Sequence, residues 1–137
     1  MAMQWIAEGC NVFNALVPFY ANITKTPEYI ANTTAEVTTE NFYWANRLIG
    51  TLADAHFQKT AIFIERYQNQ VHSKGHALLS KFDKQFMTEK PNQVQHFLEG
   101  CNEEMARMAK EETQKTLSSV LYTASNGMKN SFARSDV

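Results

Sequence analysis

Residues 11–20, Asn-Val-Phe-Asn-Ala-Leu-Val-Pro-Phe-Tyr, have the composition of a single buried β-strand. The segment is rich in apolar, β-branched and aromatic residues, which favour strands, and its Pro18 cannot donate a hydrogen bond to a ladder. No other run in the sequence has a comparable strand pattern. Because a lone strand leaves its backbone donors and acceptors unpaired, we expect this one to pair with strands outside the sequence.

Composition excludes several classes of protein. The 137 residues suit one ordinary domain, and thirteen basic residues against fourteen acidic ones are unlike the basic field of a nucleic-acid-binding protein. No apolar run approaches the length of a membrane span, and no signal peptide is recognisable, so we expect no membrane partner. The two cysteines, Cys10 and Cys101, lack metal-type spacing. A reducing, cytoplasmic location is the expectation.

Helical periodicity dominates the sequence after its first third. Thr39 is a candidate N-cap, and apolar residues then recur at spacings of three and four. The pattern predicts one long amphipathic helix from about residue 40 to about residue 87. Gly50, residues 58–60 and Gly75 are the candidate positions for a kink or a break.

A second long amphipathic helix is expected after Pro91, which suits the first turn of a helix. Its apolar stripe runs from Val94 to Ala124, and Gly127 is a suitable helix end. Two amphipathic helices of this length should pack as an antiparallel hairpin.

The predicted fold is therefore mostly α with a short N-terminal β segment, in two parts. Residues 1–38 form a strand and a connecting loop that belong to a larger sheet. Residues 39–137 form the helical hairpin and a C-terminal tail.

Candidate metal ligands and acid–base residues are few. His72 and His76 are four residues apart, the spacing of metal-binding pairs on one helix face, but no further ligand completes a site. A solvent-exposed pair is the better interpretation, and we predict no metal and no cofactor. Asp54 and His56 would point to different faces of a helix, which argues against a catalytic dyad.

The cysteines give no convincing nucleophile. Cys10 follows Gly9 and is a candidate, but a free cysteine is more often a small buried hydrophobe. Cys101 falls on the apolar stripe of its helix, which already explains it. We identify no catalytic residue in the sequence.

Asn11 and Asn14 are the polar residues of the predicted strand. A buried amide must find hydrogen bonds or cost stability. The two amides either bond a neighbouring strand or loop, or line a substrate site and donate to an oxyanion. We take Asn11 and Asn14 as candidate substrate-binding residues.

Several motifs together carry a family resemblance. The segments 9–20 and 42–49, with further matches at 52–56, 64–68 and 124–136, resemble the C-terminal region of bacterial dipeptidases of peptidase family C69. The resemblance spans essentially the whole chain, and the first two motifs are fairly specific.

The resemblance implies an N-terminal-nucleophile hydrolase with an α-β-β-α layered fold. In such enzymes a cysteine at the N-terminus of the mature chain attacks the peptide carbonyl, and its own α-amine serves as the base. The resemblance thus implies that this chain is the last third of a dipeptidase. It would lack the nucleophile, be catalytically incomplete alone, and meet its dipeptide substrate only together with the missing N-terminal part. The alternative is a non-enzymatic helical module that self-associates or binds another protein.

Overall fold

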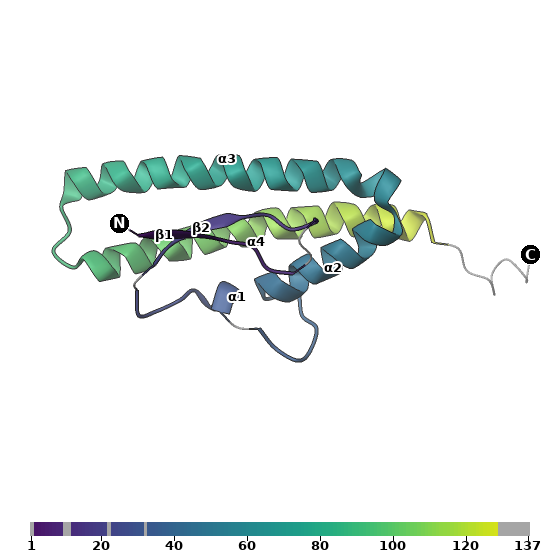
Figure 1. The fold of residues 1–137 in the computed structure, drawn as a ribbon, viewed down its shortest axis with the longest axis horizontal. Helices are drawn as coiled ribbons and strands as arrows, with labels where there is room; N and C mark the ends of the chain where they lie inside the picture. Colours follow the sequence, from purple (N-terminus) through teal and green to yellow (C-terminus); the bar gives the residue numbers. More distant parts are fainter. Residues whose placement is uncertain (1, 10–11, 22, 32, 129–137) are drawn as a thin grey trace, which may run out of the picture.

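The computed structural model describes residues 2–9, 12–21, 23–31 and 33–128, which form two short strands and four helices (Figure 1). The two long helices lie side by side and run in opposite directions (Figure 1), which confirms the predicted hairpin in a mostly helical fold. The elements in chain order are β1 (Met3–Ile6), β2 (Val17–Tyr20), α1 (Glu28–Ala31), α2 (Phe42–Ala55), α3 (Phe57–Glu89) and α4 (Val94–Asn126).

The strand prediction for residues 11–20 is wrong in its length and in its lack of a partner. The observed strand is only Val17–Tyr20, and β1 pairs with it in antiparallel register, with Met3 opposite Tyr20. The sequence Met-Gln-Trp-Ile of β1 gave little signal because it is four residues long and mostly exposed. Its pairing satisfies one edge of β2 within the chain itself.

The predicted helix over residues 40–87 is in fact two helices, α2 and α3. They join at His56, whose φ of −133° and ψ of 43° are not helical. This break lies two residues before the candidate position at 58–60, whereas Gly50 and Gly75 are inside helices. No proline or glycine marks His56. The buried hydroxyl of Thr60 in α3 donates to the main-chain oxygens of Ala53 at 3.2 Å and His56 at 2.8 Å, so a side chain bonds the backbone across the break.

The predicted helix ends are partly correct. Asn41, not Thr39, caps α2, because its side chain accepts a hydrogen bond from the backbone N–H of Trp44 at 2.9 Å. Pro91 lies in the connection before α4, which begins at Val94. Gly127 is the C-cap of α4, as predicted.

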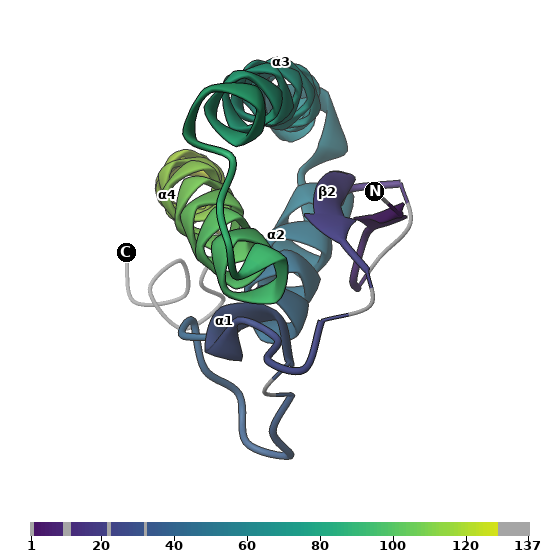
Figure 2. The same cartoon turned by 90° about the vertical axis from the view of Figure 1, so that its left-hand side faces the viewer.

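The core lies where α2, α3 and α4 meet, and β2 is part of it. Every residue of β2 is buried, whereas β1 is exposed at three of its four positions. Seen along the helices, β1 is the outer strand and β2 the inner one (Figure 2). None of the described helices combines the length and apolarity that a membrane crossing requires.

Candidate functional site

Asn14 lies in the loop between β1 and β2, which α3 holds in place. Asn14 is buried, and its Nδ2 donates to the main-chain oxygen of Glu8 at 3.1 Å. The side-chain amide of Gln68 in α3 donates to the main-chain oxygens of Val12 and Asn14, both at 3.0 Å. These bonds fix the loop from both sides, so the Asn14 side chain has a defined position.

A cavity of about 450 Å³ adjoins Asn14, and its lining combines amide side chains with the apolar residues Ala7, Ala15 and Leu16. Asn14 contributes from the loop, and Gln68, Asn69 and His72 contribute from α3. The Oδ1 atom of Asn14 makes no hydrogen bond within the described part of the chain. Amides both donate and accept hydrogen bonds, so this lining can bind the peptide group of a ligand. We call it the Asn14 cavity.

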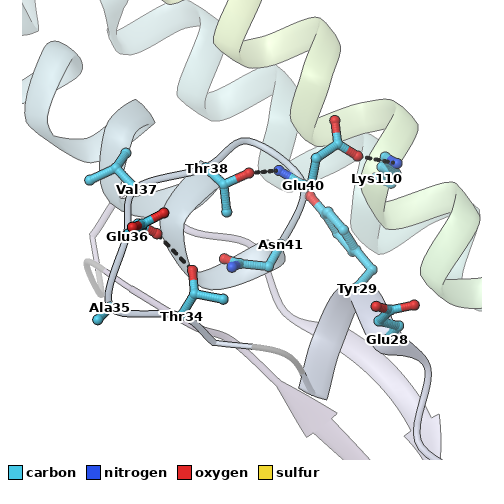
Figure 3. A pocket seen from close by; sticks show the side chains of 10 residues that line it. All are labelled: Glu28, Tyr29, Thr34, Ala35, Glu36, Val37, Thr38, Glu40, Asn41 and Lys110. Atoms are coloured by element: carbon cyan, nitrogen blue, oxygen red, sulfur yellow. Dashed lines mark hydrogen bonds and ion pairs between the residues drawn. The ribbon is translucent and has the colours of Figure 1, made fainter.

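A larger cavity of about 800 Å³ lies between α1, the loop before α2, and α4 (Figure 3). Its lining includes Glu28, Glu36 and Glu40 against the single cation Lys110, whose Nζ is 2.9 Å from Glu40 Oε2. The excess of carboxylates favours a cationic or amine ligand. The Thr34 hydroxyl, however, already bonds the loop itself, donating to the main-chain oxygen of Glu36 at 2.6 Å. The polar groups of Thr34, Glu36, Glu40 and Lys110 thus bond one another in pairs, and these bonds hold the loop in its fold.

A buried polar cluster joins α2, α3 and α4. The Tyr67 hydroxyl donates to Asn46 Oδ1 at 2.7 Å and lies 3.0 Å from the Thr113 hydroxyl. Burial, the largest effect, raises the pKa of Tyr67 far above its ordinary value. The phenol therefore stays protonated, and the cluster acts as a structural link between helices.

Two buried polar atoms, Glu8 Oε2 and Tyr29 Oη, have no hydrogen-bond partner among the residues that the structure describes. Burial raises the pKa of Glu8 and raises that of Tyr29 to about 12. Both environments favour the neutral form of the group, because burial penalises the charged form.

The remaining sequence candidates are not brought together. Cys101 is buried on α4, and burial raises its pKa to about 11, which keeps the thiol protonated and unreactive. Cys10 and Asn11 lie outside the described residues. Asp54 is exposed on α2, while His56 is at the helix junction.

His72 and His76 are both exposed, as predicted. Their ring centroids are 4.5 Å apart, and the indole of Trp5 in β1 packs against them at 5.9 and 5.1 Å. In the described ranges no group of three metal-ligating side chains forms around the pair. The two histidines therefore form the surface of α3 on which Trp5 of β1 packs.

Three further polar residues of the site and the sheet could not be recognised as such from their local sequence: Gln68, Asn69 and Asn102. The amide of Asn102 bonds the backbone of Tyr20, accepting from its N–H at 2.9 Å and donating to its oxygen at 3.0 Å. Asn102 directly follows Cys101 and is buried on α4. A polar residue next to the apolar stripe of a helix could have indicated a buried hydrogen-bonding group. Gln68 and Asn69 carried no such signal, because they belong to a polar stretch of α3.

Comparison with known proteins identifies the family. The model of peptidase family C69 matches residues 1–70, which include the motifs at 9–20 and 42–49. The "Dipeptidase" of Bifidobacterium longum (strain NCC 2705) is 39% identical over 98% of this chain and 32% of its own length. The "Probable dipeptidase A" of Streptococcus pyogenes serotype M18 (strain MGAS8232) is 40% identical over 98% of this chain and 28% of its own length.

A more distant relative, "Dipeptidase A" of Lactobacillus helveticus, is 28% identical over 76% of this chain and 22% of its own length. The chain thus spans less than a third of the curated relatives it matches. The family model and the relatives agree with the motifs found in the sequence. The chain belongs to peptidase family C69.

Proposed function

We propose that this chain is the C-terminal segment of a C69 dipeptidase and takes part in dipeptide hydrolysis only together with the rest of such an enzyme. One observation carries the proposal: 39–40% identity over 98% of the chain to proteins named as dipeptidases, of which it spans only 28–32%. Most of the length of these relatives therefore has no counterpart in this chain.

The chemistry of the described residues supports an incomplete site. A cysteine peptidase needs a thiolate, and Cys101 is buried with its pKa raised to about 11. Its neighbours on α4 explain it as a core residue. We infer that the nucleophile and its base come from the other part of the enzyme.

We further propose that Asn14 contacts the substrate. Its Nδ2 is engaged by Glu8, and its Oδ1 is available to accept a hydrogen bond from a ligand in the Asn14 cavity. Asn11, the second candidate, is proposed as a substrate contact from the sequence alone. An unpaired acceptor on a buried, fixed side chain suits the N–H groups of a dipeptide.

A chimera tests the proposal. The segment of the Bifidobacterium longum dipeptidase that aligns with this chain is replaced by this chain, and hydrolysis of a panel of unblocked dipeptides is measured. We expect turnover. A chimera that folds, with a cooperative melting transition, but hydrolyses none of the dipeptides that the parent enzyme cleaves would contradict the proposal.

The role of Asn14 is tested within the chimera by Asn14→Ala. We expect KM for dipeptides to rise while kcat changes less, because a lost substrate contact weakens binding. Gln70→Ala, an exposed amide on α3 outside the Asn14 cavity, is the matched control. Unchanged KM and kcat in Asn14→Ala would show that Asn14 only holds the loop.

A further inference from the structure

The two edges of the small sheet differ in their hydrogen bonding. The N–H of Ala21 donates to the oxygen of Ala2 at 2.9 Å, and these residues are opposite each other in the register that pairs Met3 with Tyr20. Because hydrogen-bonded and non-hydrogen-bonded pairs alternate in antiparallel strands, the backbone groups of Pro18 and Tyr20 point away from β1. By the same rule those of Met3 and Trp5 point away from β2.

The edge of β2 that faces away from β1 is the inner edge of the sheet, and the helices close it. The amide of Asn102 satisfies both the N–H and the oxygen of Tyr20. Pro18 has no N–H to offer, and its ring lies against α3, where its Cδ is 3.1 Å from the position that a Cβ of Gly75 would take. No further strand can add to β2.

The outer edge of β1 is open. Met3 is 41% exposed and Trp5 36% exposed, and no other described strand pairs with β1 (Figure 2). Proteins usually protect such an edge with lysine, proline or a bulge, since it pairs readily with other strands. The sequence Met-Gln-Trp-Ile has no charged residue and no proline, and the one proline of the sheet is in the inner strand.

The open edge is also held firmly. The indole of Trp5 packs on His72 and His76 of α3, so β1 is supported from one face. The outward backbone groups of Met3 and Trp5 have no hydrogen-bond partner among the residues that the structure describes. A preordered edge loses little conformational freedom when a strand is added. β1 therefore has the properties of a docking edge.

We propose that the outer edge of β1 receives an extended strand from the remaining part of the dipeptidase, through the N–H and oxygen of Met3 and Trp5. This rests on the proposed function, and the occupant follows from the more than two thirds of each relative that this chain does not cover. Strand addition at an exposed edge gains affinity from main-chain hydrogen bonds. The sheet thus extends at β1 and ends at Asn102.

Amide hydrogen exchange tests this residue by residue. In the isolated chain the Gln4 and Ile6 amides, which face β2, should exchange slowly, and those of Met3 and Trp5 quickly. In the Bifidobacterium longum chimera we expect the Trp5 and Met3 amides to exchange at least about tenfold more slowly than in the isolated chain. Unchanged exchange of both amides in the chimera would overturn the proposal.

The test separates this inference from the proposed function. If the chimera hydrolyses dipeptides but its Trp5 amide is not protected, the proposed function stands and the docking edge is wrong. If the chimera is inactive but the Trp5 amide is protected, the docking edge stands and the proposed function is wrong. Protection in the isolated chain that grows with its concentration would assign the edge to a second copy and would contradict the proposal.

A backbone variant gives a second readout. Met3→Pro removes an outward N–H and leaves the ladder to β2 intact, whereas Gln4→Pro removes a ladder donor. Met3→Pro should lower the melting temperature of the chimera and not that of the isolated chain, while Gln4→Pro should lower both. Equal melting temperatures of the Met3→Pro chimera and its parent would count against the docking edge.

Discussion

The side-chain amide of Asn102 in α4 takes the place of a neighbouring strand for Tyr20 in β2. Its Oδ1 accepts from the Tyr20 N–H at 2.9 Å, and its Nδ2 donates to the Tyr20 oxygen at 3.0 Å. Both residues are buried, so water cannot replace these bonds. One helical residue thereby attaches the sheet to the helices and closes its inner edge.

Asn102→Ala should therefore destabilise the chain by roughly 2–4 kcal/mol, because two buried main-chain groups lose their partners. Urea unfolding followed by circular dichroism measures the change. Gln114→Ala, at an exposed position of the same helix, is the control and should change the unfolding free energy little. Equal effects of the two substitutions would show that the Asn102 bonds contribute nothing.

Two glycines in long helices should respond to alanine with opposite signs. At Gly100 a new Cβ meets nothing within 4 Å, so Gly100→Ala should stabilise by about 1 kcal/mol through helix propensity. At Gly75 it lies 3.1 Å from Pro18 Cδ. Pro18 cannot retreat easily, because Asn102 fixes the strand two residues later.

For Gly75→Ala we expect a net loss of stability, since an overpacking cost of about 1–3 kcal/mol exceeds the helix gain. Thermal unfolding of both variants beside the parent chain makes the comparison. Equal stabilisation by the two alanines would mean that β2 does not press against α3 at Gly75.

Tyr67→Phe tests the buried polar cluster. The phenol donates to Asn46 and contacts Thr113, so its removal leaves a buried acceptor unpaired and should cost about 1–2 kcal/mol. Tyr122→Phe is the matched control, since Tyr122 is 70% exposed on α4. The free energy of unfolding in urea should separate the two. Equal urea midpoints of Tyr67→Phe and Tyr122→Phe would show that the Tyr67 hydroxyl does not stabilise the fold.

Glu112 should make stability depend on pH on the acid side. Burial raises its pKa, but hydrogen bonds from Lys74 at 3.0 Å and Lys115 at 3.1 Å outweigh this and hold the pKa below its ordinary value. A lowered pKa contributes stability above the unfolded-state pKa, and this contribution disappears as pH falls through the folded-state pKa.

The stability difference between the parent chain and Glu112→Gln should thus be largest near neutral pH and shrink between about pH 5 and pH 3. Urea midpoints of both proteins across this range give the measurement. A difference that stays constant with pH would show that the charge of Glu112 is not what stabilises the fold.

The long helices could be predicted because their apolar residues recur with helical spacing, and Gly127 marked an end correctly. A break near residues 58–60 was among the expected positions, but its exact place at His56 could not be predicted, because neither proline nor glycine marks that residue. The strand β1 was missed because a four-residue exposed segment has no buried alternation. Its presence changed the expected lone strand into a hairpin.

For the candidate site, the sequence indicated Asn14 because a buried amide in an apolar segment needs partners. It could not indicate that Gln68 or His72 lies beside Asn14, because those residues come close to Asn14 only when α3 packs against the loop. Long-range contacts of this kind leave no local pattern. The family motifs, in contrast, could be found in the sequence without any structure.

Release of amino acids from dipeptides most directly tests the claim that this chain is a segment of a C69 dipeptidase. The isolated chain and the Bifidobacterium longum chimera are assayed at equal molarity. We expect turnover by the chimera and none by the isolated chain. Turnover by the isolated chain that Cys10→Ala abolishes would contradict the claim.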